Sequence, residues 1–592
     1  ARTGDQGQVF RELGFERLIP GLTARSLITE PGSPAIHRLQ ASANRPREQS
    51  ARVSELLQWQ LNAPLTNNLL PIQQTEADLV VTSAAELLAP SETEWSQMFS
   101  TDGPFAHINA VGGSKNLFSN DLGLGYQYGP IVVGLGQYHY EFDGYADNND
   151  QTRDIYGATV QWQPAPSTVL FSEYRHDERD FGDLSLGFGV EDIAPDFRTR
   201  INNDRWRLGL RQSLRPNMDL IATVAGFDGT EHQTDVVFST GIRAKDDSNG
   251  WLGELQLSYR GSAGALTSGA GYYDSDSVLE LITAGSFEIP DLGIVDFVSY
   301  SKDKSHTRHK NAYTYWSAAP YERLSYTLGL TYDDYQGPEL DRDQFSPKFG
   351  VLWEPVDGLQ LRAVAARSLK RALVAEQTLE PTQVMGFTQM FDDPNGTDAT
   401  LYGIAMDAGL GSDVFLGAEL RGRNLTVPYP GQYSDTQRTD WKERNGALYA
   451  YWTPTDKIAV RAELLYEDLT YDDRLPRADV PWSTRSLKTT EVPISMAYFS
   501  PRGYSARFVA RWVDQDAKLI STFDPTAPER SESDRFWTAD LEFGYRLPKQ
   551  YGRVILGARN LFDQDFGYQE PDLNHPNLAR ERTIYLSLSL AL

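Results

Sequence analysis

From about residue 104 to the C-terminus, the chain alternates apolar residues with polar or small ones. In the stretch "ERLSYTLGLTY" every second position is apolar: Leu324, Tyr326, Leu328, Leu330 and Tyr332. A period of two predicts β-strands that have one apolar face. The pattern recurs throughout residues 104–592 without a helical layer, which favours a large barrel with lipid outside and water or polar protein inside. A soluble β-solenoid or propeller is the alternative interpretation.

The connections between these strands alternate in length. "PAPST", "PNM" and "PVDG" have the composition of tight turns, whereas residues 143–154, 180–204 and 370–398 are long and polar. Short periplasmic turns that alternate with long external loops are typical of transmembrane barrels. The sequence therefore predicts an all-β membrane protein, an antiparallel transmembrane β-barrel of about 22 strands, with the long stretches outside.

Residues 1–65 follow a different period. In "ARVSELLQWQL" the apolar side chains of Val53, Leu56, Leu57 and Leu61 are three and four residues apart, which predicts a helix. The order of Leu13-Gly14, Ala24, Leu27 and Pro31 resembles a degenerate tetratricopeptide repeat. Such repeats stack because one helical pair cannot bury its own face. We expect a periplasmic segment with further repeats upstream; a short helical cap over one barrel mouth is the alternative.

The predicted domain organisation has three parts. Residues 1–65 are the helical segment, residues 66–103 are a connector with Pro, Asn and acidic residues, and residues 104–592 are the barrel. The chain opens with "ARTGDQGQVF", which has neither an initiator Met nor a signal peptide. An outer-membrane protein must be exported, so we expect a longer precursor.

Three stretches make a family resemblance specific. They are "FSPKFGVLWEPVDGLQLRAVAARSLKRA" (345–372), "LEPTQVMGF" (379–387) and "GARNLFDQDFGYQEP" (557–571). In that order they resemble the mid-barrel hairpin, the Leu-x-Pro-Glu phrase and the closing strand pair of TonB-dependent receptors, with Thr382 in place of the Glu. The resemblance implies an outer-membrane barrel of a Gram-negative bacterium, in contact with lipid and lipopolysaccharide.

Two features depart from that family. "EADLVVTSA" resembles the receptors' energy-coupling box and plug entry, but it lies too close to the first predicted strand to leave room for a plug domain. The chain ends at Leu592, where outer-membrane strands usually end in an aromatic residue. The first departure puts energy-coupled uptake by this chain in doubt.

Composition removes several classes of function. The net charge of −26 makes nucleic acid an unsuitable partner, because a phosphate-binding surface needs a basic patch. The absence of Cys removes disulfides and thiolate metal sites. The eight His residues are scattered, and neither a phosphate loop nor a nucleophile elbow occurs. We therefore expect that the protein is not an enzyme and has no catalytic or cofactor-binding residues.

Charged residues supply the remaining site candidates. Asp147, Asp150 and Asp154 lie in one acidic stretch and are weak candidates for a structural Ca²⁺ site, with a solvated loop as the simpler interpretation. A basic set surrounds the mid-barrel hairpin: Lys348, Arg362, Arg367, Lys370 and Arg371. Those that face the lumen would either guide an anionic substrate or pair with lumen carboxylates, and we expect pairing.

A barrel of this size needs something to fill or gate its lumen. The leading hypothesis is an export or surface-assembly conduit, in which periplasmic helical repeats collect a polymer or protein that passes outward. The second is a TonB-type uptake receptor whose plug is supplied upstream or in trans. The third is a structural anchor for a surface assembly that transports nothing. We expect a periplasmic or surface protein, or a polymer, as a partner.

Overall fold

The alternating pattern forms one continuous sheet. The computed structural model describes residues 2–41, 49–63, 65, 102–184, 187–188, 194–237, 240–289, 293–338, 340–390, 393–430, 436–471, 482–521, 526–570 and 578–591. The strands of the sheet are β1 Gly103–Gly113, β2 Phe118–Tyr128, β3 Ile131–Phe142, β4 Gln151–Ala165, β5 Thr168–Phe181, β6 Arg198–Arg215, β7 Met218–Val237, β8 Thr240–Gly261, β9 Gly264–Ile289, β10 Gly293–Tyr321, β11 Leu324–Gln336, β12 Asp341–Val356, β13 Leu359–Leu369, β16 Asp398–Leu410, β17 Val414–Pro430, β18 Thr436–Thr455, β19 Ile458–Tyr471, β20 Trp482–Phe499, β21 Tyr504–Ser521, β22 Arg530–Arg546, β23 Gly552–Arg559 and β24 Thr583–Ala591.

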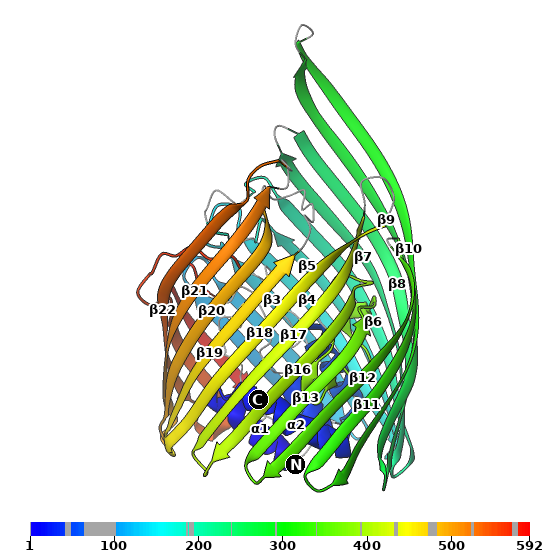
Figure 1. The fold of residues 1–592 in the computed structure, drawn as a ribbon, viewed down its shortest axis with the longest axis vertical. Coiled ribbons are helices and arrows are strands. Elements are labelled where there is room, and N and C mark those ends of the chain that lie inside the picture. Colours follow the sequence, from blue (N-terminus) through cyan, green and yellow to red (C-terminus); the bar gives the residue numbers. More distant parts are fainter. Residues whose placement is uncertain are drawn as a thin grey trace.

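The sheet closes on itself as a 22-stranded antiparallel barrel (Figure 1). Closure is made by β1, which pairs with β2 on one side and with β24 on the other, where Ile108 faces Leu590. A closed sheet leaves no edge within the membrane, so every ladder hydrogen bond is made between strands. The predicted barrel and its strand number are confirmed.

Burial along the strands follows the predicted alternation. On β2 the side chains of Leu124 and Tyr126 are 48% and 52% exposed on the outside, whereas Ser119 and Asp121 are buried toward the lumen. An apolar outer face and a polar inner face are what a barrel in lipid requires. None of the helices that the structure describes is both long enough and apolar enough to span a membrane.

The two ends of the barrel differ. The three tight turns predicted from the sequence connect β4 to β5, β6 to β7 and β12 to β13, and all lie at one end. Large aromatic side chains are exposed close to this short-turn end: Tyr128, Trp162, Tyr321, Trp353 and Trp452. They form the aromatic girdle expected at a membrane interface, and short turns mark the periplasmic side in bacterial outer-membrane barrels.

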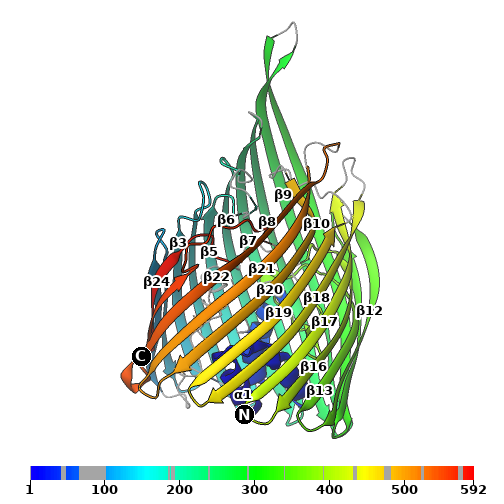
Figure 2. The same ribbon diagram turned by 60° about the vertical axis from the view of Figure 1, so that its left-hand side comes forward.

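The helices lie inside the barrel near the short-turn end, as Figures 1 and 2 both show. They are α1 Arg2–Leu13, η1 Glu16–Leu18, α2 Ile19–Thr29, α3 Pro34–Ala41 and α4 Gln49–Asn62. Pro20 is tolerated because it occupies the first turn of α2, where its missing N–H has no helical partner. Helical structure in residues 1–65 is confirmed, and its packing partners are side chains of the barrel wall. Continuation as a repeat array upstream stays a prediction.

Residues 370–390 also fold into the lumen, so the prediction of an external loop at 370–398 is wrong for this part of the stretch. This inward segment contains η5 Val374–Glu376 and a hairpin of β14 Gln383–Val384 and β15 Phe387–Thr388. Leu379 and Phe387 are almost fully buried. Met385 and Gly386 both have positive φ, as the turn of a two-residue hairpin requires. The polar composition of this stretch did not distinguish the two locations, because polar side chains are stable in a polar lumen as well as in solvent.

Candidate functional site

The candidate site is the packed lumen, where the helices meet the inward segment. Helix α4 contacts the segment through polar groups: Ser54 Oγ donates to the Glu376 carbonyl at 2.9 Å, and Gln58 Nε2 donates to the Leu379 carbonyl at 2.7 Å. Thr382 Oγ1 donates to Glu55 Oε1 at 3.1 Å. These bonds hold together two parts of the chain that are more than three hundred residues apart in the sequence.

Helix α4 is also fixed to the barrel wall. The Arg207 guanidinium on β6 donates to Gln60 and to Glu173 of β5, and Arg211 Nη1 donates to the Asn62 carbonyl at 3.2 Å. A small apolar cluster accompanies these bonds: Leu57, Leu61, Phe171, Ile221 and Leu379. The helix is therefore held by a mixture of arginine contacts and modest apolar packing.

The chain between α1 and α2, which includes η1, contacts the opposite part of the wall. Phe15 stacks on Tyr451 of β18 with ring centroids 4.6 Å apart, and Arg17 pairs with Glu463 of β19 at 3.2 Å. On α2, a Cβ built on Gly21 would come within 2.3 Å of Gln360 and 2.9 Å of Asp407. This close approach needs a residue without a side chain, which explains Gly in the first turn of α2.

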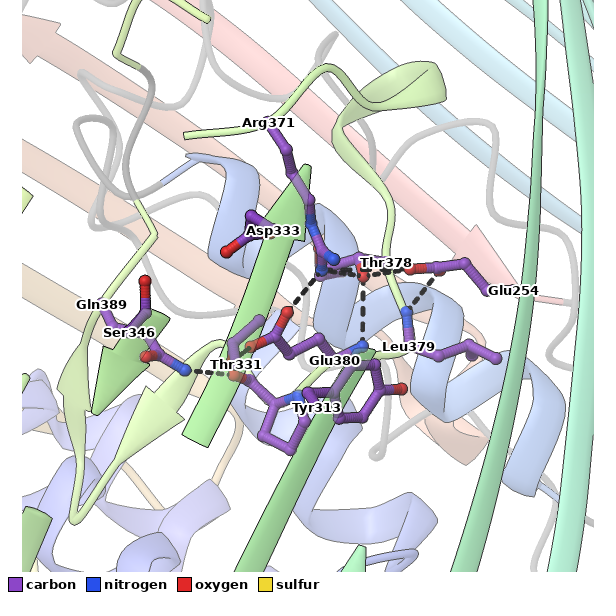
Figure 3. A network of polar contacts seen from close by, with 12 residues as sticks. Glu254, Tyr313, Thr331, Asp333, Ser346, Arg371, Thr378, Leu379, Glu380 and Gln389 are labelled. Atoms are coloured by element: carbon purple, nitrogen blue, oxygen red, sulfur yellow. Dashed lines mark hydrogen bonds and ion pairs between the residues drawn. The ribbon is translucent and has the colours of Figure 1, made fainter. Parts of the chain in front are cut away.

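A buried charge network centres on Glu380 of the inward segment (Figure 3). Arg371 Nη2 lies 2.9 Å from Glu380 Oε2, and Lys348 Nζ of β12 lies 3.7 Å from Oε1. The hydroxyls of Tyr315 and Thr331 donate to Oε1 at 2.6 and 2.7 Å. Burial by itself raises the pKa of Glu380, but the two cations and these hydrogen bonds outweigh it and hold the pKa below its usual value.

A second carboxylate, Glu254 of β8, completes the network. It accepts hydrogen bonds from Thr378 Oγ1 at 2.6 Å and from the Leu379 backbone N–H at 2.7 Å, and it lies 3.9 Å from Arg371. Glu254 and Glu380 therefore face Arg371 from the wall and from the segment respectively (Figure 3). The network fastens the middle of the inward segment to four strands of the barrel, β8, β10, β11 and β12.

The five basic candidates lie as follows. Lys348 and Arg371 both lie beside Glu380, and Arg362 lies 3.4 Å from Asp407 and donates to the Met385 carbonyl beneath the hairpin. Lys370 pairs with Glu376 at 2.6 Å. Arg367 pairs with Asp398 at 2.7 Å on a partly exposed surface. All five have carboxylate partners, and a role in guiding an anionic substrate stays a prediction. Sequence reasoning missed Glu380 and Glu254. A lone carboxylate in "LEPTQ", soon after Lys370 and Arg371, was the available signal for Glu380.

The three acidic candidates for Ca²⁺ are not brought together. Asp150 pairs with Arg198 at 2.7 Å, Asp154 with His139 at 2.8 Å, and Asp147 is exposed. Across the described residues, no three His, Cys, Asp or Glu side chains are grouped as metal ligands would be. The arrangement gives the Ca²⁺ hypothesis no support.

A buried pair joins the last two helices. His37 of α3 contacts the Glu55 carboxylate of α4 through Nδ1, and its Nε2 donates to the Pro31 carbonyl at 2.7 Å. Burial alone lowers the pKa of His37, but the Glu55 charge and the two hydrogen bonds outweigh it, so the pKa rises above 6.5.

Because the folded-state pKa of His37 is raised, its stabilising effect is complete below pH 6.5 and is lost as pH rises through the higher value. We expect His37→Gln to lower the protection of α3 and α4 amides by about 2 kcal/mol at pH 6, and by less at alkaline pH. Hydrogen exchange measured against pH would show this difference. His139→Gln, in a partly exposed pair on the barrel, serves as the control. Equal losses at every pH would contradict the ion pair.

Residues 118–403 match the family described as "TonB dependent receptor-like, beta-barrel". Similar solved structures include the copper transporter OprC (15% identity, 84% of this chain and 81% of that chain, TM-score 0.62). Others are the siderophore receptor PiuA from Acinetobacter baumannii (13%, 84% and 82%, 0.59) and the FrpB iron transporter from Neisseria meningitidis (12%, 83% and 82%, 0.61). No curated protein matches.

At these identities the solved structures show a shared fold. The residues that match the family are just under half of the chain. The chain is a 22-stranded outer-membrane β-barrel that is similar to the barrels of TonB-dependent receptors.

Proposed function

We propose that this protein is a gated conduit across the outer membrane, in which helices α1–α4 and the inward segment together close the lumen. Passage of a substrate requires the helices to leave or to shift. The proposal places the helices at the periplasmic mouth, where the short turns lie.

The polarity of the wall behind the helices carries this proposal. Side chains that face the helices and the segment include Arg207, Glu254, Gln256, Arg362 and Glu463. A wall that stays covered permanently is usually apolar, because burying charge has a large desolvation penalty. Water hydrates a polar wall readily when the helices leave it, so opening the lumen requires less free energy than it would with an apolar wall.

The proposal has two versions, which differ in the direction in which the substrate crosses the membrane. Export of a polymer or protein collected by periplasmic helices agrees with helices that enter from the short-turn end. Uptake fits the same geometry and is favoured by the similar structures, which are those of a copper transporter, an iron transporter and a siderophore receptor. A structural anchor would also have a filled lumen, but it would never open.

A reversible disulfide between α4 and β6 tests whether the helices must move for the lumen to open. A Cβ on Gly209 of β6 would lie 2.3 Å from Leu61 Cδ2 of α4, and the chain has no Cys, so Leu61→Cys with Gly209→Cys gives one cross-link at that contact. We expect channel openings in a planar bilayer to disappear in the oxidised pair and to return with a reductant. Each single-Cys variant is the control. Identical, silent traces for the locked and unlocked chains would favour the anchor.

A further inference from the structure

The hairpin of β9 and β10 rises far beyond the other strands at the long-loop end (Figures 1 and 2). Its two strands pair continuously up to Gly293 and Ile289. On the other side of β10, the ladder with β11 ends where Arg308 faces Gln336. Among the described residues, β10 above Arg308 therefore has a neighbouring strand on one side only, and its other side is a free edge.

This edge has only one of the features that usually block strand pairing. Natural edge strands are protected by charged side chains, by Pro, by bulges or by being short, and here only charged side chains such as Lys302 and Lys304 are present. The β9–β10 ladder has no register shift, and β10 has no Pro above Arg308. Ile294 and Val298 are each 76% exposed and Tyr300 is 58% exposed. Such β-branched and aromatic residues favour strand pairing, and free-edge backbone groups lack ladder partners.

Charges on the same face restrict the partner. Lys302 pairs with Glu280 at 2.6 Å and His306 with Asp276 at 3.0 Å, both across the hairpin. Lys304 lies opposite Val278 and is exposed, without an ion-pair partner in the described part of the chain. An acidic side chain on a strand added at the free edge would face this ammonium group.

We propose that the free edge of β10 binds an extended polypeptide strand from outside the cell by β-augmentation. Backbone hydrogen bonds supply the affinity, since the spacing of alternating N–H and C=O groups matches only another strand. Specificity comes from an acidic residue opposite Lys304 and apolar residues opposite Val298 and Tyr300. The proposal is independent of the gate and of the direction of transport.

A second copy of this chain is the poorer occupant. Two barrels in one membrane hold their hairpins in the same direction, so two β10 edges would meet in the parallel sense. The twofold axis that would relate two such edges puts each side chain, including those of Lys302 and Lys304, and its copy on opposite faces of the joined sheet, which does not fit the common pleat of a parallel ladder. A foreign strand is free to run antiparallel and to present acidic residues there.

The test uses the full chain in detergent and a labelled synthetic strand of about twelve residues. The strand alternates Thr with, in order, Glu, Glu, Val, Val, Lys and Val, so that its antiparallel register sets Glu opposite Lys304 and Val opposite Tyr300. We expect saturable binding by fluorescence anisotropy. Hydrogen exchange should slow in residues 293–307 and remain unchanged in the barrel wall.

Two variants make the outcome decisive. Ser277 and Ser305 face each other in the ladder, so an Asn-Gly turn between them shortens the hairpin in register, and binding should weaken at least about tenfold. Lys304→Glu should weaken binding about two- to fivefold and improve binding of a strand with Lys in place of Glu. Lys549→Glu, an exposed position in the turn before β23, is the charge-matched control.

Three results would overturn the proposal. They are the absence of saturable binding, binding that survives the shortened hairpin, and exchange protection outside residues 293–307. Hairpin-dependent dimerisation without peptide binding would assign the edge to a second copy instead, which also overturns it.

Discussion

A chain that lacks residues 1–65 should conduct ions steadily, with a conductance at least about tenfold above that of the full chain. The physical reason is that the helices occupy the lumen near the short-turn end and hold the inward segment through Ser54 and Gln58. Removing the helices empties their part of the lumen and also removes the contacts that hold the inward segment in place. Single-channel recording in a planar bilayer measures the change.

The matched control for this deletion is Arg25→Ala. Its partner is Glu354 at 2.8 Å, but Arg25 is exposed, and a surface ion pair contributes little. The variant should conduct as the full chain does. If the deletion also leaves the conductance unchanged, the inward segment and the long loops are sufficient to close the barrel, and the helices are not the gate.

The second large effect is expected at Glu380. Replacement by Ala leaves Arg371 and Lys348 buried without their shared carboxylate, which should lower the free energy of unfolding by about 3–5 kcal/mol. The inward segment should also become sensitive to proteases added to the purified barrel. Denaturant unfolding followed by tryptophan fluorescence measures the first effect, and limited proteolysis measures the second.

The pH dependence of this effect has a definite sign. The folded-state pKa of Glu380 is lowered, so its stabilising contribution is present above its ordinary value of 4.5 and is lost as pH falls through the lower value. The Glu380→Ala variant and the full chain should therefore converge in stability in acid. Asp357→Ala, which removes an almost fully exposed carboxylate beside Arg323, should change nothing. A similar loss at both positions would contradict the role given to the buried network.

Prediction of the wall from sequence succeeded because each strand carries its own signal. The side chain of Leu328 faces lipid and that of Thr327 faces the lumen, whatever the rest of the chain does, because successive side chains of a strand point to opposite faces. Tight turns such as the one between β12 and β13 are equally local. Lys348 and Arg362 were singled out because they surround the mid-barrel hairpin, and the structure buries both side chains.

The contents of the lumen were not predictable in this way. Residues 370–390 have the composition of an external loop, and only the positions of Glu254, Lys348 and Glu380 in space show that their polar groups are satisfied inside. The helical segment was recognised by its period, but its packing partners, such as Tyr451 and Arg207, lie on strands hundreds of residues away.

The sequence by itself therefore determined the barrel, its strand number, the orientation of its faces and the helical character of the N-terminal segment, because local periodicity encodes all of these. Only the tertiary structure decided what occupies the lumen and where an edge of the sheet remains free. Both depend on pairings between distant residues, such as Ser54 with Glu376 and Arg308 with Gln336, and no local pattern records such pairings.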